Sequence, residues 1–429
     1  MNVLVLGSDG RAHALTWRLA ASPSVESVAC APGNPGMAAL TACHPVDAND
    51  PAAVAQLADD LDVDLVVVSA EEPLVRGVVD AVEARGLVAF GPTAAGARLE
   101  GSKAWMKEVL AAAGVPTARH GAFDAGDEER ALAFLDGLPG LYVVKTDGLA
   151  AGKGVVVTDS LGDARDTVRS YLSGEAFGDA GRTLVIEEGL TGPELSLLVV
   201  CNGTEDGLPL APAQDFKRIG DGDTGPNTGG MGAYSPVPIA GPDLVDEVME
   251  RAVRPTLREL ARRGIAYKGV LYAGLMLTPA GPKMLEYNVR LGDPEAQAVL
   301  PRLVGDFAGL CHAAATGQAD LDASFADDAC VTVVLATEGY PVSARTGDVI
   351  EGIDVAEDLP GIAVFHAGTA VRDGRLVTAG GRVLNVSALA PTLAAARERA
   401  YEAAALISWP GMQYRRDIAA EAAAATGVD

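Results

Sequence analysis

The chain has 429 residues, of which 49% are hydrophobic and 21% charged, a composition typical of a folded protein with two to four domains. Its formal net charge of −25 disfavours nonspecific binding to nucleic acid or to anionic membranes, although local cations can still bind a small anion. The five cysteines form no C-x-x-C pair, so we expect reduced thiols in a cytoplasmic protein. The start, MNVLVLGSDG, lacks the basic segment of a signal peptide, and no apolar run reaches the roughly 18 residues of a membrane span.

Residues 1–101 are expected to form an open parallel α/β domain, because apolar strand patterns alternate with helical ones. The expected strands are 2–7, 25–31, 64–70 and 87–91, and the expected helices are 11–22, 51–61 and 74–86. Ligands of such sheets bind beyond the carboxyl ends of the strands. The dinucleotide fingerprint G-x-G-x-x-G is absent from the first loop, which argues against an oxidoreductase.

A second domain is expected over residues 102–326, with a lid subdomain at about 121–188. It starts with a helix over 102–114, followed by strands over 142–145, 154–158, 183–188, 196–202, 270–278 and 283–289, with a helix near 163–173. A small, strand-rich carboxy-terminal domain is expected over 327–429. Its expected strands are 330–336, 363–370 and 382–388, with a closing helix near 391–408.

The stretch VVKTDGLAAGKGVVV, residues 143–157, resembles a Walker A phosphate loop but lacks one spacer residue and its hydroxyl side chain. A β-branched run follows it, which predicts a hairpin rather than a strand-to-helix loop. Lys145, Lys153 and Lys103 would gather near a glycine-rich turn containing Gly152, a set suited to phosphate. An ordinary hairpin with surface lysines is an equal alternative.

The stretch MLEYNVRLGDPEAQ, residues 284–297, indicates a metal site. In a strand, Glu286, Asn288 and Arg290 point to one face because the side-chain period is two. The next turn adds Asp293, so hard oxygen ligands lie beside an arginine, as expected where Mg²⁺ bridges nucleotide phosphates. The alternative is a solvated edge strand.

Two further stretches suggest ligand contacts. In LVIEEGLTGPELSL the strand ends at Glu187 and Glu188, and Glu194 is free to accept hydrogen bonds from ribose hydroxyls. The long loop QDFKRIGDGDTGPNTGGMGAYSP contains Asp215 and Lys217 and has no periodicity. Loops of this length in compact domains are usually functional or disordered, and its composition favours an ordered substrate loop.

Taken together, these stretches resemble the ATP-grasp ligases, and within them the phosphoribosylamine–glycine ligase family. The resemblance covers essentially the whole chain. It rests on GSDGRAHAL, FGPT with LEGSK, VVKTDGLAAGKGV, IEEGLTGPE, QDFKRIGDGDTGPNTGGMGAYSP, EYNVRLGDPEAQ, GGRVLNV and ISWPGM.

The resemblance implies that ATP lies between two β-layers and that Glu286 and Asn288 hold Mg²⁺, with Mn²⁺ as a possible substitute. The implied ATP-binding residues are Lys103, Lys145, Gly152, Lys153, Glu187, Glu188, Leu190 and Glu194. Those implied on the substrate side are Gly10, Glu71, Asp215, Lys217, Arg290 and Asp293. Lys145, Arg290 and Asp215 are expected to be catalytic. Of the hairpin lysines, Lys145 is the stronger candidate for phosphate contact.

The implied reaction joins glycine to 5-phosphoribosylamine through glycyl phosphate, with release of ADP and phosphate, in de novo purine biosynthesis. Glycine, 5-phosphoribosylamine and ATP are therefore the expected partners. The expected state is a monomer or weak dimer, because no sustained heptad pattern occurs.

The chain departs from its relatives on the amine-substrate side. Asp9 replaces a glycine, Ala12 replaces a glutamate, and Ser69-Ala70 stand where Gly-Pro is usual. An acid beside a phosphate is unfavourable unless it points away. Sequence drift explains these changes, but a paralogous amide ligase with another amine is the alternative. A nucleotide-binding regulator without catalysis is disfavoured by the intact metal and ATP motifs. His13 could approach the phosphate or serve its helix.

Overall fold

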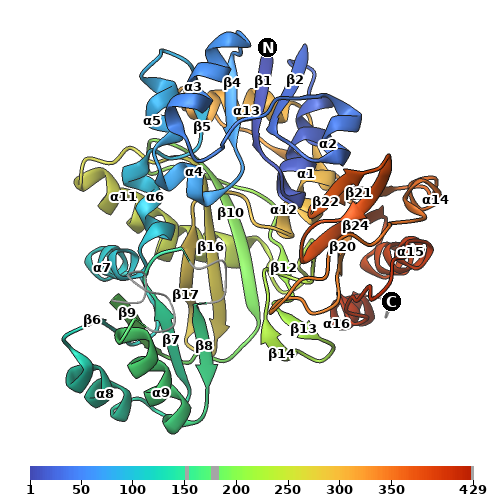
Figure 1. Cartoon of the computed structure of the whole chain (residues 1–429). Helices are drawn as coiled ribbons and strands as arrows, with labels where there is room; N and C mark the ends of the chain where they lie inside the picture. The colour runs from blue at the N-terminus through green and yellow to red at the C-terminus, as the bar shows by residue number, and fades with distance from the viewer. Residues whose placement is uncertain (150–153, 175–182, 427–429) are drawn as a thin grey trace.

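The computed structural model describes residues 1–149, 154–174 and 183–426. Figure 1 shows an amino-terminal domain at the top, a carboxy-terminal domain at the right and a smaller lid at the lower left, around a central sheet. The expected α/β class, with a parallel amino-terminal sheet and a strand-rich carboxy-terminal part, is confirmed.

The amino-terminal sheet is parallel, with strand order β3-β2-β1-β4-β5. Its strands are β1 (Asn2–Gly7), β2 (Ser27–Pro32), β3 (Ala42–Cys43), β4 (Leu65–Val68) and β5 (Ala89–Phe90). Its helices are α1 (Gly10–Ala20), α2 (Pro35–Leu40), α3 (Pro51–Asp60), α4 (Glu71–Val75), α5 (Val78–Glu83) and α6 (Ala94–Gly101). The single helix expected over 74–86 was wrong. Gly77 adopts φ 86° and separates two short helices.

The lid is an antiparallel sheet of order β6-β9-β7-β8 covered by two helices. Its elements are β6 (His120–Asp124), α8 (Glu128–Asp136), β7 (Tyr142–Thr146), β8 (Val155–Thr158), α9 (Leu161–Leu172) and β9 (Thr183–Glu188). β7 pairs with β8, with Lys145 opposite Val155, which confirms the hairpin and excludes a P-loop. The lid has its own hydrophobic cluster, including Leu135, Val144 and Ile186.

The central sheet is antiparallel, with strand order β11-β10-β16-β17. Its strands are β10 (Glu194–Asn202), β11 (Leu208–Pro209), β16 (Lys268–Thr278) and β17 (Gly281–Asn288). The surrounding helices and short strands are α7 (Lys103–Ala113), α10 (Pro242–Val248), η2 (Met249–Val253), α11 (Arg254–Arg262), α12 (Glu295–Val299), η3 (Leu300–Arg302), β18 (Leu303–Val304), α13 (Phe307–Ala315) and β19 (Ser324–Phe325). Ser102 caps α7 by accepting a hydrogen bond from Trp105 N, and Gly114 ends it at φ 68°, as expected from the sequence.

The carboxy-terminal sheet has strand order β12-β15-β20-β24-β21 and so contains two strands of the glycine-rich loop. The loop strands are β12 (Gln214–Asp215), β13 (Arg218–Gly220), β14 (Thr224–Asn227) and β15 (Gly232–Ser235). The later elements are β20 (Ala329–Ala336), α14 (Ile353–Glu357), β21 (Ile362–His366), β22 (Thr369–Arg372), β23 (Arg375–Thr378), β24 (Arg382–Ala390), α15 (Leu393–Leu406) and α16 (Ala420–Thr426). The single strand expected over 363–370 was wrong, because a turn at 367–368 divides it into β21 and β22.

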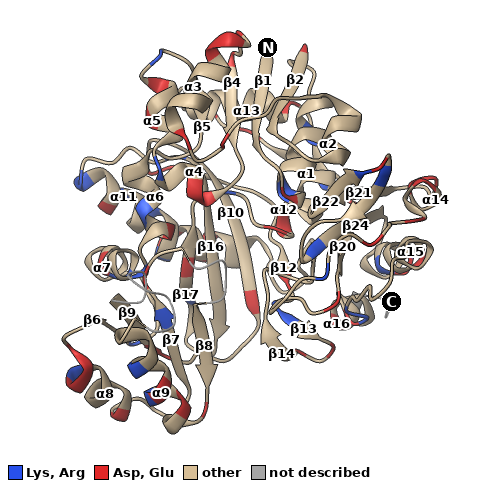
Figure 2. Ribbon diagram, in the orientation of Figure 1, with Lys and Arg blue, Asp and Glu red and all other residues tan. Residues whose placement is uncertain are grey.

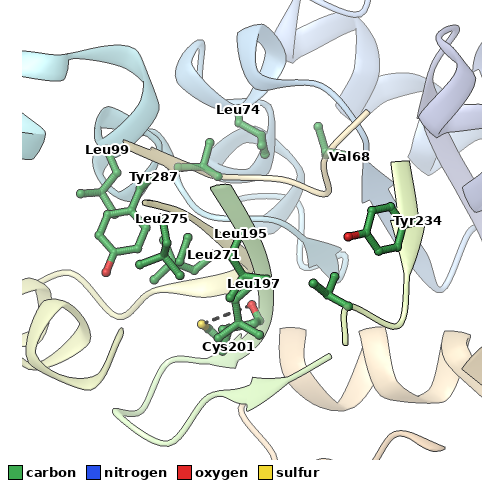
Figure 3. Close-up of a cluster of buried hydrophobic side chains, with 14 of the residues drawn as sticks. Val68, Leu74, Leu99, Leu195, Leu197, Cys201, Tyr234, Leu271, Leu275 and Tyr287 are labelled. Carbon is green, nitrogen blue, oxygen red and sulfur yellow. Dashed lines mark hydrogen bonds between the residues drawn. The ribbon is translucent and has the colours of Figure 1, made fainter. Parts of the chain in front are cut away.

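One hydrophobic cluster crosses all the parts except the lid. It runs from Val68 and Leu74 through Leu197 and Leu271 of the central sheet to Tyr234 of the loop (Figure 3). A continuous core of this kind holds the parts in register, so a cavity between them has defined walls. Among the described residues, no helix is both long and apolar enough to cross a membrane.

A glycine-to-glycine contact joins the amino-terminal domain to the central sheet. Gly269 has φ +98°, and a Cβ added there would lie 2.7 Å from Gly91 Cα. We expect Gly269→Ala to lower the free energy of unfolding by about 2–4 kcal/mol, since it adds backbone strain and a clash. Urea unfolding measures this. The control is Gly86→Ala, at φ +79° with open space around it, which should cost about 1 kcal/mol. Equal costs would contradict the contact.

Candidate functional site

A cavity of about 380 Å³ lies where the amino-terminal domain, the central sheet, the glycine-rich loop, the carboxy-terminal domain and the β7–β8 hairpin of the lid meet. Eight residues expected from the sequence line it: Glu71, Lys103, Asp215, Lys217, Glu286, Asn288, Arg290 and Asp293. Acidic residues are also spread over the outer helices α3, α5, α8 and α14 (Figure 2). The lining of the cavity brings together residues that are separated by more than 200 positions in the chain, such as Glu71 and Arg290.

Other expected site residues lie off the wall of this cavity. Among the described residues these are Gly10, Lys145, Glu187, Glu188, Leu190 and Glu194. Gly10 begins α1, where an added Cβ would meet the side-chain amides of Asn385 and Gln297. Glu188 accepts a hydrogen bond from Arg119 N at 3.0 Å. Gly152 and Lys153 lie outside the described residues, so their expected contacts are untested.

β17 presents the expected metal pair to the cavity. Glu286 and Asn288 lie on the same side of the strand, and the intervening Tyr287 is buried on the other, as the alternation predicted. Burial opposes ionisation of Glu286, but nearby ammonium groups outweigh it and hold its pKa below the ordinary value. In order of effect these are Lys217, Lys145 and Lys103.

These two side chains fit a hard cation. In the part of the chain that the structure describes, no side chain forms a hydrogen bond or ion pair with the Glu286 carboxylate. Among the described residues, the one hydrogen bond that Asn288 Oδ1 accepts is a long one of 3.3 Å from Arg290 Nη2. Three or more His, Cys, Asp or Glu side chains do not gather around one point among those residues. A cation here would therefore complete its shell with water or ligand oxygens, which is the usual habit of Mg²⁺.

Arg290 is held by two carboxylates. Its Nε donates to Glu71 Oε2 at 3.1 Å and its Nη2 donates to Glu100 Oε1 at 2.6 Å. Burial tends to raise the pKa of Glu71, but Arg290 and Arg11 outweigh it and lower that pKa to about 2. Burial raises the pKa of Glu100 to about 7 despite Arg290. Glu100 was missed by the sequence reasoning, although it lies in the quoted LEGSK motif.

Asp9 lines the cavity, but both oxygens of its carboxylate are bonded to groups of its own helix. Oδ1 accepts a hydrogen bond from Ala12 N at 2.7 Å and so caps α1, and Oδ2 pairs with Arg11 at 2.7 Å. Arg11 in turn donates to Leu291 O at 2.9 Å, which ties the first loop to the turn after β17. The charge of Asp9 is therefore neutralised by a neighbour.

Lys145 lies near the cavity but does not line it. Its Nζ lies 2.9 Å from Glu187 Oε1 and 3.5 Å from Leu285 O of β17. Burial lowers the pKa of Lys145, but Glu187 and Glu286 outweigh it, so the net direction is upward and the ammonium stays charged. Glu187 is buried, with its side chain between Lys145 and Lys107 of α7. Lys107 was not expected from the sequence, because helical spacing alone does not reveal a buried lysine.

The glycine-rich loop contacts β10 through an ion pair. Lys217 Nζ lies 2.5 Å from Glu194 Oε2. Burial raises the pKa of Asp215 well above its ordinary value, although Lys217 acts in the opposite direction. Tyr272 and Glu295 complete this wall, with the Tyr272 hydroxyl donating to Glu295 Oε1 at 2.5 Å.

The carboxy-terminal domain contributes two cavity residues that the sequence reasoning missed. Arg382, at the start of β24, donates to Asp293 O at 2.7 Å and to Gly229 O. The Tyr340 hydroxyl accepts a hydrogen bond from Gly229 N at 2.9 Å. The quoted motif GGRVLNV contains Arg382, so this signal was present without an assigned role.

His13 serves the packing of two domains. Its Nδ1 accepts a hydrogen bond from His366 N of β21 at 2.8 Å, and its ring lies edge-on to Phe365. Burial and the neighbouring His366 lower the pKa of His13 to about 3, so the ring is neutral near pH 7. Neither histidine lines the cavity.

The raised pKa of Glu100 predicts a pH-dependent stability. Because its folded pKa of about 7 exceeds the ordinary 4.5, the native chain loses stability as pH rises from 4.5 to 7. Glutamine does not titrate. We therefore expect the free energy of unfolding of Glu100→Gln, taken relative to that of the native chain, to rise by up to about 3 kcal/mol between pH 4.5 and pH 7. Urea unfolding at pH 5 and pH 8 measures the difference, and a difference independent of pH would contradict the prediction.

Three models of the phosphoribosylglycinamide synthetase family match the chain. The N domain matches residues 1–100, the ATP-grasp (A) domain residues 101–296 and the C domain residues 330–421. The chain is 52% identical to a Streptomyces coelicolor protein named phosphoribosylamine–glycine ligase, over 99% of this chain and 100% of that one. A Brucella melitensis protein of the same name is 48% identical, over 97% of each chain.

Solved structures agree with these matches. Phosphoribosylamine–glycine ligase from Thermotoga maritima is 35% identical with a TM-score of 0.84, over 97% of this chain and 100% of that one. A biotin carboxylase from Campylobacter jejuni has a TM-score of 0.71 at 12% identity, over 98% of each chain, which shows a shared fold alone. From the amino-terminal sheet to the carboxy-terminal one, the chain belongs to the phosphoribosylglycinamide synthetase family, with its ATP-grasp domain in the middle.

Proposed function

We propose that this chain is an ATP-dependent ligase that joins glycine to 5-phosphoribosylamine and forms glycinamide ribonucleotide, ADP and phosphate, as a step of purine biosynthesis. The observation that carries the proposal is the cavity itself. It combines the expected metal ligands of β17, Glu286 and Asn288, with an arginine held by two carboxylates and with the glycine-rich loop, at the junction of the three matched family domains. The names of the full-length relatives support the same activity.

The nucleotide would lie between the lid sheet and the central sheet. Lys103 and Lys145 would face its phosphates, together with Gly152 and Lys153 of the hairpin turn. Glu188 and the backbone at Glu187 and Leu190 would meet the adenine, and Glu194 the ribose. Glu286 and Asn288 would hold Mg²⁺, with Mn²⁺ as a substitute, and the ion would neutralise charge on the phosphates.

The first step is attack of the glycine carboxylate on the γ-phosphate, which breaks the bond to ADP and gives glycyl phosphate. Here the chain acts mainly by positioning and charge. Arg290 is suited to orient a carboxylate, because Glu71 and Glu100 fix its guanidinium plane. Closure of the lid would protect the acyl phosphate from water.

The second step is attack of the neutral amine on the acyl carbon, with phosphate as leaving group. We assign the amine substrate to the side lined by the first loop, with Gly10, Glu71, Lys217 and Asp293. Asp215, on the cavity wall, would take the proton that the amine loses. The pairing of Asp9 with Arg11 removes the electrostatic objection to a phosphate nearby.

The proposal also covers the domain limits, the oligomeric state and the cellular setting. We place the domain limits at 1–101, 102–326 and 327–429, with the lid at about 121–188. The chain would act as a monomer or weak dimer. Its five cysteines are free, which fits a reducing, cytoplasmic setting.

The test is ADP release with Mg²⁺, ATP and glycine, with and without 5-phosphoribosylamine. We expect sustained ADP release only when the amine is present, because the acyl phosphate is held until the amine attacks it. No response to this amine would favour a paralogue with another amine substrate. Nucleotide binding without turnover would favour a regulator.

Glu286→Gln tests the metal pair. We expect kcat/KM to fall by about 10²-fold or more, because the variant loses the negative charge that would bind the cation. The Mg²⁺ concentration needed for half-maximal rate should rise as well. The matched control is Glu351→Gln on the carboxy-terminal domain, an exposed carboxylate outside the cavity, which should leave both values unchanged. An active Glu286→Gln enzyme with normal Mg²⁺ dependence would refute the assignment.

A further inference from the structure

Lys107 is a buried cation with no role in the proposed reaction. It lies on α7 and is 1% exposed, and burial of a lysine is costly unless it is paired. Its Nζ lies 2.8 Å from Glu187 Oε2 and donates to Thr117 Oγ1 at 2.7 Å. It does not line the cavity, so it cannot be counted among the groups that touch a ligand there.

Glu187 is shared between two lysines. One carboxylate oxygen pairs with Lys107 at 2.8 Å and the other pairs with Lys145 at 2.9 Å. The side chains of Glu187 and Lys107 are each 2% exposed, and that of Lys145 is 8% exposed. Two positive charges thus share one negative charge, and these three groups together carry a net charge of about +1 at pH 7. Glu286 is a further carboxylate near Lys145, and it is shared with Lys217 and Lys103.

This group also connects the two β-layers. Lys145 is on β7 and Glu187 is on β9, so both belong to the lid sheet. The link to β17 of the central sheet runs through Lys145 to Leu285 O, and through Thr117, which donates to Met284 O at 2.7 Å. The group therefore lies at the base of the space between the layers.

We propose that Lys107 is a positioning residue, which takes up half of the Glu187 carboxylate and so leaves Lys145 with uncompensated positive charge for the nucleotide phosphates. Without Lys107, Glu187 and Lys145 form a neutral one-to-one pair. The attraction for a phosphate then falls, although Lys145 itself is unchanged. The inference rests on the proposed function in that the nucleotide is ATP.

The protonation states agree with this geometry. Burial lowers the pKa of Lys107 to about 8, so it is still charged at pH 7. Burial tends to raise the pKa of Glu187, but Lys145 and Lys107 outweigh it and the net direction is downward. All three groups are therefore ionised at neutral pH.

A charge-balance cycle tests the proposal, with the dissociation constant of Mg·ATP measured by calorimetry in the absence of glycine and amine. Lys107→Met makes the group neutral, and we expect weakening on the order of tenfold, from the loss of one unit charge at short range. The double variant Lys107→Met with Glu187→Gln restores the +1 charge, so its dissociation constant should return to within about threefold of the native value. A double variant that binds no better than Lys107→Met would overturn the proposal.

Thr117→Val is the matched control. It removes the hydroxyl that accepts from Lys107 but keeps every charge, so thermal stability should fall while the dissociation constant changes less than about twofold. Weakening equal to that of Lys107→Met would mean that Lys107 acts through packing alone, and it would also overturn the proposal. Because binding is measured without the amine, this result is independent of whether 5-phosphoribosylamine proves to be the substrate.

Discussion

Mutual neutralisation of buried charges is the constraint on which the rest of the structure depends. Some charged side chains of the cavity wall, such as Arg290 and Glu100, are largely buried, and an unpaired ion in such a place costs several kcal/mol. The pairs accordingly cross domain boundaries. Arg290 of the central region binds Glu71 of the amino-terminal domain, and Arg382 of the carboxy-terminal domain pairs with Asp293 at 3.3 Å. The ion pairs that prepare the site thus also help to hold the domains together.

The charges that remain free are as informative as those that are paired. Glu286 has cationic neighbours but no bonded partner among the described residues, and the group of Lys107, Glu187 and Lys145 keeps an excess positive charge. The carboxylate of Glu286 could bind a cation and the ammonium of Lys145 an anion, so together they are complementary to a metal nucleotide.

The hydrophobic packing gives the cavity fixed walls and leaves the lid with a core of its own. One hydrophobic cluster unites the amino-terminal domain, the central sheet and the carboxy-terminal domain, whereas the lid has a separate cluster. Rigid walls keep Glu286, Asn288 and Arg290 in register. The lid has its own core and is joined to these walls by the pair of Glu187 with Lys107 of α7 and by the contact of Lys145 with Leu285 O of β17.

Local patterns in the sequence predicted most of the longer strands, the hairpin in place of a P-loop, and the alternation that brings Glu286 and Asn288 to one face, because these follow from a side-chain period of two. Arg290 lies beyond the end of β17 and lines the cavity from the bend that follows it. The same patterns failed where a backbone exception decided the outcome, as at Gly77, which divides an expected helix. Only the tertiary structure revealed Glu100, Lys107, Tyr340 and Arg382 as parts of the site or its support. Their partners lie on other elements, and Lys107 pairs with Glu187, 80 positions away in the chain. The tertiary structure also explains Asp9, whose presence in the first loop is unusual for the family. Its side chain caps α1 and forms an ion pair with Arg11. Long-range pairing depends on how the sheets and helices pack, and no local period encodes that.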